Sequence, residues 1–244
     1  MIKLALFGYG QMGKLIHQLV SDYETEVISI YDQPLGYELN QEKLNQSEVI
    51  IDFSLPDQVI TNLKLAAENK KNIVVGTTGW YDQLPAAMNI CQQADLGMIY
   101  GSNFSLGMNL FLEMINSAAK MMDKSPEYDI YGYEMHHNKK IDSPSGTAKV
   151  ISDKLLKNIT RKKKVIYNSL NRKIQPEEFH FSSLRAGSIP GIHAVGFDSQ
   201  ADTIELTHTA RNRSGFAIGA IKAANWIRGK RGIYNFSEIF KELI

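Results

Sequence analysis

A glycine-rich loop near the start of the chain constrains the fold most. Residues Ile2 to Phe7 form a short apolar run, typical of a buried strand, and Gly8-Tyr-Gly-Gln-Met-Gly13 follows at once. Apolar residues then recur at helical spacing from Lys14 to Ser21. A second apolar run ends at Asp32, about 20 residues after the loop. Strand, glycine loop, helix, strand and acidic residue, in this order, predict a dinucleotide-binding βαβ unit.

Each glycine of the loop has its own expected role. Gly8 permits the tight turn, Gly10 lets a diphosphate approach the backbone, and Gly13 lets helix and strand pack closely. The diphosphate is expected at the helix N-terminus, where free N–H groups and the helix dipole favour an anion. Asp32 is expected to bind the ribose hydroxyls. The loop's other residues complete this part of the predicted cofactor site: Tyr9, Gln11 and Met12.

The residues around the predicted ribose favour NADH. A carboxylate at Asp32 repels a 2′-phosphate, and neither neighbouring loop contains an arginine. Gln11 and Gln33 are neutral, and Lys14 is the one cation close by in the sequence. We therefore expect a nicotinamide cofactor, NADH or NADPH, with NADH used at least as well as NADPH.

The first hundred residues repeat the alternation of strand and helix patterns. Apolar runs at 27–31, 48–53, 73–75 and 97–100 predict strands, and 58–69 predicts an amphipathic helix. This repetition predicts an α/β fold with a Rossmann-type, doubly wound parallel sheet. Residues just past two of these strands are expected to face the cofactor, because ligands bind at the carboxyl ends of such strands. They are Gly76, Thr77, Thr78, Gly101, Ser102, Asn103 and Phe104.

The pattern changes after the first hundred residues. A helix is predicted over 109–122, with the methionines Met114, Met121 and Met122 in the core. Several strand patterns follow, and two of them, 178–184 and 202–208, alternate apolar and polar side chains. Such alternation is typical of a sheet with one face in water or covered by a partner.

We expect the chain to pass between two domains and return. The Rossmann domain comprises 1–104 and 214–244, because the Ala-rich pattern at 216–228 resembles a helix that covers a sheet. The intervening residues, 105–213, form a second, α+β domain for substrate binding and oligomerisation.

The run from Glu134 to Ala148 concentrates groups that bind and protonate anions. Two imidazoles, His136 and His137, stand at the end of a predicted strand, and Lys140 follows in the next loop. Adjacent strand residues point to opposite faces, so the two histidines are not expected to chelate one ion. No cysteine or carboxylate is expected to complete a ligand set, and no metal site is predicted. Together with a dinucleotide site, this run indicates a reductase acting on a dicarboxylic acid.

A helix start completes the same run. Ser143 or Ser145 is expected to cap the helix. The first-turn N–H groups of Gly146 and Thr147 then remain free to bind a carboxylate. Gly146 has no side chain to obstruct such an anion. Ser145, Gly146 and Thr147 are therefore candidate substrate-binding residues.

Composition excludes several partners. The formal net charge of +1 gives no global field that would attract nucleic acid or a membrane surface. The basic run Arg161 to Lys164 is predicted to be a solvated loop rather than a nucleic-acid patch. The single cysteine, Cys91, and the absence of a signal peptide or a bilayer-length apolar run predict a cytoplasmic protein.

These residues together resemble a known family, the 4-hydroxy-tetrahydrodipicolinate (dihydrodipicolinate) reductases of the diaminopimelate–lysine pathway. The resemblance covers essentially the whole chain. Its most specific part is Glu134-x-His136-His137-x-x-Lys140-x-Asp142-x-Pro144-Ser145-Gly146-Thr147-Ala148. Supporting matches are Asp52-Phe-Ser54, Gly76-Thr-Thr-Gly79, Asn103-Phe-Ser105, Arg185-Ala-Gly187, Gly191, His193 and Thr207-His208.

The resemblance implies an activity and roles. The activity is reduction of 4-hydroxy-tetrahydrodipicolinate to tetrahydrodipicolinate with NADH or NADPH. His136 would donate and accept a proton, and Lys140 would donate one. His137, Gly146 and Thr147 would bind the substrate, and the second domain's sheet would build a homotetramer. The chain departs from the commoner family pattern in a glycine loop one residue shorter, with Gln11 in place of the loop arginine and Gln33 after the acidic residue.

Two other functions stay open from the residues alone. One is another two-domain NAD-dependent dehydrogenase that acts on a small carboxylic acid. The other is a non-catalytic NADH-sensing module, which would need the glycine loop but not His136 and Lys140.

Overall fold

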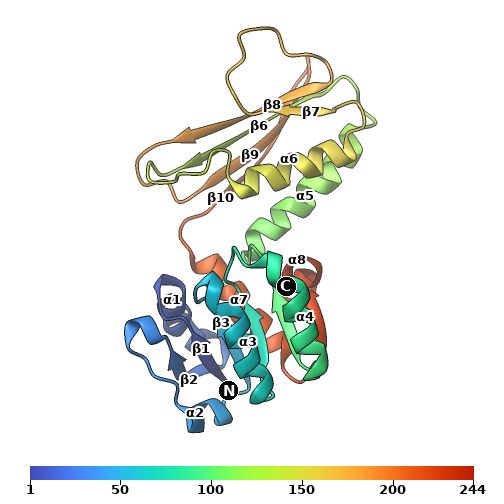
Figure 1. The fold of residues 1–244 in the computed structure, drawn as a ribbon. Helices are drawn as coiled ribbons and strands as arrows, with labels where there is room; N and C mark the ends of the chain where they lie inside the picture. Colours follow the sequence, from blue (N-terminus) through green and yellow to red (C-terminus); the bar gives the residue numbers. More distant parts are fainter. The chain divides into compact units, whose positions relative to one another are not determined.

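The computed structural model describes residues 1–244, which divide into two compact units (Figure 1). One unit comprises Met1–Asn109 and Arg213–Ile244, and the other comprises Leu110–Asn212. The first contains a six-stranded sheet and the second a five-stranded sheet.

The first unit is built on a parallel sheet, as predicted. Its strand order is β11-β5-β4-β3-β1-β2, and every neighbouring pair is parallel. The order reverses between β1 and β3, and such a switch point is where ligands bind in doubly wound folds. The strands are β1 (Ile2–Phe7), β2 (Thr25–Tyr31), β3 (Val49–Asp52), β4 (Asn72–Val75), β5 (Gly97–Tyr100) and β11 (Gly232–Asn235).

Helices cover this sheet and bury its strands. The interior residues of β1, β3 and β4 are at most 1% exposed, which explains why their sequences are continuous apolar runs. The α-helices of this unit are α1 (Gln11–Leu19), α2 (Gln41–Gln46), α3 (Val59–Glu68), α4 (Leu84–Gln93), α7 (Ser214–Ile227) and α8 (Phe236–Ile239).

The C-terminal segment adds an edge strand to the sheet. Helix α7 packs against α1 and the strands, and β11 then pairs with β5. The side-chain amide of Asn72 holds the segment between α7 and β11 in place, because its Nδ2 donates to the carbonyls of Ile227 (2.6 Å) and Lys230 (2.9 Å). Its Oδ1 accepts from the N–H of Gly97 (2.8 Å). Strand β11 was not predicted, because its sequence, Gly-Ile-Tyr-Asn, has only two apolar residues.

The second unit holds a mixed sheet in the order β10-β9-β6-β8-β7. Strands β6, β8 and β7 are parallel, whereas β9 and β10 are antiparallel to their neighbours. Helices α5 and α6 lie on one side of the sheet (Figure 1). The elements are α5 (Leu106–Met122), β6 (Asp129–His136), α6 (Gly146–Asn158), β7 (Lys164–Ile166), β8 (Glu178–Arg185), β9 (Ile192–Asp198) and β10 (Thr203–Thr209).

The basic run is only in part the solvated loop that its composition predicted, because Lys163 and Lys164 are exposed but Lys162 is buried. Lys162 is 4% exposed, and its Nζ donates to the carbonyls of Pro176 and Glu178, both at 2.8 Å. The same ammonium lies 2.5 Å from the carboxylate of Asp129. Arg161 likewise binds two backbone carbonyls. Lys162 thereby joins the starts of β6 and β8, and Arg161 joins the end of α5 to the residue before β6, which a charge count cannot show.

The prediction that Met114 and Met121 are core residues was wrong. They are 52% and 62% exposed, whereas Phe111 and Ile115 are buried. Met114 precedes Ile115 by one position and therefore lies about 100° around the helix from it. The buried stripe of α5 is narrower than the apolar sequence suggested.

Every helix of the structure is too short or too polar to cross a lipid bilayer.

Candidate active site

The glycine loop has the geometry that a dinucleotide diphosphate requires. Gly8 has a φ of +90°, and a Cβ there would lie 2.4 Å from the carbonyl oxygen of Phe53. A Cβ on Gly13 would lie 2.2 Å from the oxygen of Gly8. A Cβ on Gly10 would meet nothing within 4 Å, so open space lies beside the backbone at the start of α1. Two glycines are thus required by packing, and the third leaves room for a ligand.

A pocket of about 220 Å³ adjoins this loop. Asp32 lines it, together with Gly8, Gly10 and the segment that follows β2. The carboxylate of Asp32 accepts from the N–H groups of Tyr9 (2.5 Å) and Leu35 (3.2 Å), which fixes its direction. The residues present therefore fit the adenosine half of a nicotinamide dinucleotide.

The two other predicted cofactor loops follow β4 and β5 on the same sheet edge. Thr78 and Ser102 are exposed. Thr77 and Phe104 are buried, at 6% and 2% exposure, so their side chains pack inside the protein. Phe104 packs between Phe53 and Phe236. These two positions can offer a ligand little besides backbone.

Asp52 organises one of these loops and was not among the predicted site residues. The carboxylate is fully buried and accepts from the N–H and hydroxyl of Ser54, from Asn62 and from Thr77, at 2.6 to 3.0 Å. Burial raises its pKa, and these hydrogen bonds oppose that rise. Asp52 thereby ties the end of β3 to the Gly76–Thr78 loop.

An arginine also reaches the glycine loop from far along the chain. The guanidinium of Arg213 donates to the side-chain oxygen of Gln11. Arg213 precedes α7, so a search for cations near Gly8–Gly13 in the sequence misses it.

The second unit gathers the predicted proton-transfer residues at one end of its sheet. His136 is the last residue of β6 and is 7% exposed. His137 follows it and is half-buried. Lys140 lies in the next loop, where its Nζ is 2.7 Å from the carboxylate of Asp142. That ion pair lowers the pKa of Asp142.

One of the two predicted cap residues begins helix α6. Ser145, not Ser143, is the N-cap, and its hydroxyl accepts from the N–H of Ala148 at 3.1 Å. The earlier N–H groups, of Gly146 and Thr147, precede the intrahelical hydrogen bonds. A Cβ on Gly146 would meet nothing within 4 Å, so this helix start faces open space.

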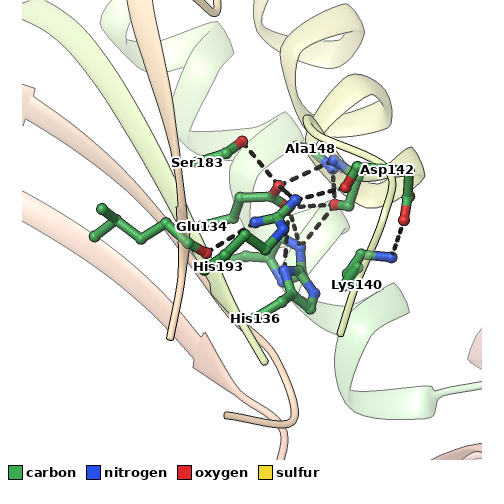
Figure 2. A network of polar contacts seen from close by, with 10 residues as sticks. Glu134, His136, Lys140, Asp142, Ala148, Ser183 and His193 are labelled. Carbon is green, nitrogen blue, oxygen red and sulfur yellow. Dashed lines mark hydrogen bonds and ion pairs between the residues drawn. The ribbon is translucent and has the colours of Figure 1, made fainter. Parts of the chain in front are cut away.

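A buried carboxylate contacts both His136 and the start of α6 (Figure 2). Glu134 is 0% exposed and stands beside Ser183 on β8 and His193 on β9 in the strand register. One oxygen, Oε1, accepts from the N–H of Ser145, the hydroxyl of Ser183 and the guanidinium of Arg185, each at 2.9 Å. Three strands and a helix start therefore meet on one side chain.

The other carboxylate oxygen faces two imidazoles. Glu134 Oε2 lies 3.5 Å from His136 Nδ1 and 3.4 Å from His193 Nε2, and the Ser145 hydroxyl also donates to it. Burial alone would raise the pKa of Glu134, but hydrogen bonds from His193, Ser145 and Arg185 hold it well below its usual range. Burial lowers the pKa of His136 to about 4, and the negative charge of Glu134 opposes that fall.

Glu134, His136 and His193 together have the donor atoms of a metal site, all within 4.8 Å of one another. The expectation that no carboxylate joins the histidines was therefore wrong, because Glu134 lies beside both His136 and His193. The guanidinium of Arg185, 2.9 Å from the same carboxylate, already supplies a positive charge there. We therefore interpret the set as a hydrogen-bond network.

Comparison with known proteins covers both units. Residues 2–104 match the family described as Dihydrodipicolinate reductase, N-terminus, and residues 107–240 match Dihydrodipicolinate reductase, C-terminus. The 4-hydroxy-tetrahydrodipicolinate reductase of Christiangramia forsetii is 34% identical over 243 residues, which are 99% of each chain. The protein of the same name from Buchnera aphidicola subsp. Baizongia pistaciae is 37% identical over 206 residues, covering 82% of this chain and 75% of that relative.

A solved structure shows the same fold. It is described as a dipicolinate-bound dihydrodipicolinate reductase from Paenisporosarcina sp. TG-14. The TM-score is 0.78 at 24% identity, over 98% of this chain and 99% of the other.

Proposed function

Because this chain belongs to the dihydrodipicolinate reductase family, we propose that it reduces 4-hydroxy-tetrahydrodipicolinate to tetrahydrodipicolinate in diaminopimelate–lysine biosynthesis. The 4-hydroxyl group leaves as water, which gives a double bond between C4 and the adjacent carbon, conjugated with the imine. A bound reduced nicotinamide would supply the hydride that adds to C4. A proton adds to the adjacent carbon. The cofactor half comprises 1–104 and 214–244, and the substrate half comprises 105–213.

The observation that carries this proposal is a buried imidazole beside an open, capped helix start. Ser145 links the two, because its N–H and hydroxyl bind Glu134 and its backbone begins α6. His136 moves the proton, and Lys140 is a second donor. The first-turn N–H groups of Gly146 and Thr147 bind a substrate carboxylate, aided by the helix dipole. His137 is the remaining substrate-binding side chain, since the N–H and the hydroxyl of the other candidate, Ser145, are both donated to Glu134.

For the cofactor we propose that NADH is used at least as well as NADPH. Asp32 is held in place by two N–H donors in the pocket beside the glycine loop, where it suits ribose hydroxyls and repels a 2′-phosphate. Gln11 and Gln33 cannot neutralise that phosphate. The guanidinium of Arg213 lies at Gln11, which begins α1, and this is the place expected for the diphosphate that both cofactors share.

We further propose a homotetramer formed through the open face of the five-stranded sheet. Tyr131 and Tyr133 lie on the face opposite to His136, and both hydroxyls donate to Glu205. Leu184, on the same face, is 51% exposed. Light scattering at micromolar concentration should give four times the monomer mass, and Leu184→Glu should lower it. A monomeric wild-type protein would contradict the proposal.

We also propose a cytoplasmic location. The one thiol, Cys91, is fully buried and unpaired, and burial raises its pKa to about 11, which makes it unreactive. Cell fractionation tests the location, and recovery outside the cytoplasm would contradict it.

The direct test of the function is oxidation of NADH by the purified protein. The absorbance of NADH should fall only when the condensation product of aspartate semialdehyde and pyruvate is present. His136→Ala and Lys140→Ala should each lose turnover but still bind NADH. A wild-type protein that binds NADH without turnover would instead favour a sensing module.

A further inference from the structure

We propose that Glu134 is a positioning residue of the reaction. Its carboxylate fixes the imidazole of His136 and, through Ser145, joins it to the helix start that receives the substrate carboxylate. The inference rests on the proposed function, because it depends on the proton transfer assigned to His136. Glu134 is the charged side chain of the network that contacts both features.

Apart from Ser145, which donates to both, the two oxygens of Glu134 have different partners. Oε1 accepts from three donors, on Ser145, Ser183 and Arg185, which is enough to hold a buried carboxylate in one orientation. Oε2 accepts from the Ser145 hydroxyl, lies 3.4 Å from His193 Nε2, and is directed at Nδ1 of His136, 3.5 Å away. That nitrogen is buried and has no hydrogen-bond partner of its own. Oε2 is therefore the acceptor toward which an Nδ1 proton would point.

The opposite ring nitrogen of His136 is left for the substrate. A Cβ on Gly191 would lie 3.2 Å from His136 Nε2, so the glycine leaves space next to this nitrogen. With Nδ1–H directed at Glu134, Nε2 can carry the proton that is transferred and take it up again. This is the arrangement by which a carboxylate selects one tautomer of a catalytic imidazole.

Among the surrounding charges, Glu134 is the one that stabilises the protonated form of His136. Burial disfavours an imidazolium at His136, and so do the neighbouring His193, Lys140 and Arg185. Glu134 is the charged neighbour that favours it. Replacing its charge by a neutral amide should therefore make His136 harder to protonate.

The test compares Glu134→Gln with Ser183→Ala. The first removes the charge but keeps the shape, and the second removes one hydrogen bond to the same carboxylate but leaves the charge. In the pH dependence of kcat, the limb that reports protonated His136 should move down by about one pH unit or more in Glu134→Gln and stay in place in Ser183→Ala. At neutral pH kcat should fall about tenfold or more, with the KM for NADH unchanged. Loss of kcat with an unmoved pH profile would show a merely structural role and overturn the proposal.

Nitrogen-15 NMR of the His136 ring tests the inference without turnover. The wild-type neutral ring should be the Nδ1–H tautomer, and its pKa should fall in Glu134→Gln. The Nε2–H tautomer in the wild type would overturn the proposal even if the variant does not fold. Absence of wild-type turnover together with the expected tautomer would contradict the proposed reaction but not the orientation of the His136 ring by Glu134.

Discussion

The guanidinium of Arg213 donates a hydrogen bond to the side chain of Gln11, although the two residues are 202 positions apart. We expect Arg213→Ala to raise the KM for NADH and NADPH by the same factor, about tenfold, because the lost charge would serve the shared diphosphate. Steady-state kinetics with both cofactors measures this. Arg211→Ala, a change at an exposed neighbour, is the matched control. A loss confined to NADPH would mean that Arg213 contacts the 2′-phosphate.

Gly146 provides a test of the carboxylate site. Gly146→Ala adds a methyl group that meets no protein atom within 4 Å, so the melting temperature should not fall. The methyl group would enter the space in front of the first-turn N–H groups. We expect the KM for the substrate to rise about tenfold or more, with the KM for NADH unchanged. Lys149→Ala, on an exposed position of α6, is the control. An unchanged substrate KM would place the carboxylate elsewhere.

The elements that sequence could predict are those with local signals. The loop from Gly8 to Gly13 lies between a strand and a helix, so its function is readable from neighbouring residues. The cap of α6 was narrowed to Ser143 or Ser145 by residue type. Choosing between them required the position of Glu134, which binds Ser145 from another element.

The network around Glu134 could not be predicted, for a physical reason. Its partners Ser183 and Arg185 come from β8, and His193 comes from β9. They meet Glu134 because β6 lies between these strands in one particular register. A shift of one residue would move the set to the other face. No local pattern specifies that register.

Lys162 tests whether the basic run is structural. Lys162→Ala would leave two carbonyls and the carboxylate of Asp129 without their shared donor. We expect the free energy of unfolding to fall by about 2 to 4 kcal/mol. Urea denaturation measures the loss. Lys163→Ala, at an exposed position, should lower the free energy of unfolding only slightly. Equal losses in the two variants would contradict the structural role.

His136 should make the protein sensitive to acid. Burial lowers its pKa from 6.5 to about 4, so between these values the unfolded state binds more protons than the folded state. The stability contributed by the neutral ring is therefore complete above pH 6.5 and is lost as the pH falls toward 4. His136→Asn removes this titration. Its free energy of unfolding should depend less steeply on pH in that interval than the wild type's, and equal slopes would contradict the expectation.

Isotope transfer tests the proposed reaction most directly. NADH with deuterium at nicotinamide C4 is incubated with the wild-type protein and the aspartate semialdehyde–pyruvate condensation product, and the product is analysed by NMR and mass spectrometry. We predict deuterium at C4 of tetrahydrodipicolinate and a solvent-derived hydrogen at the adjacent carbon, with neither product nor label transfer in His136→Ala. NADH that binds but transfers no deuterium to this product would contradict the assignment.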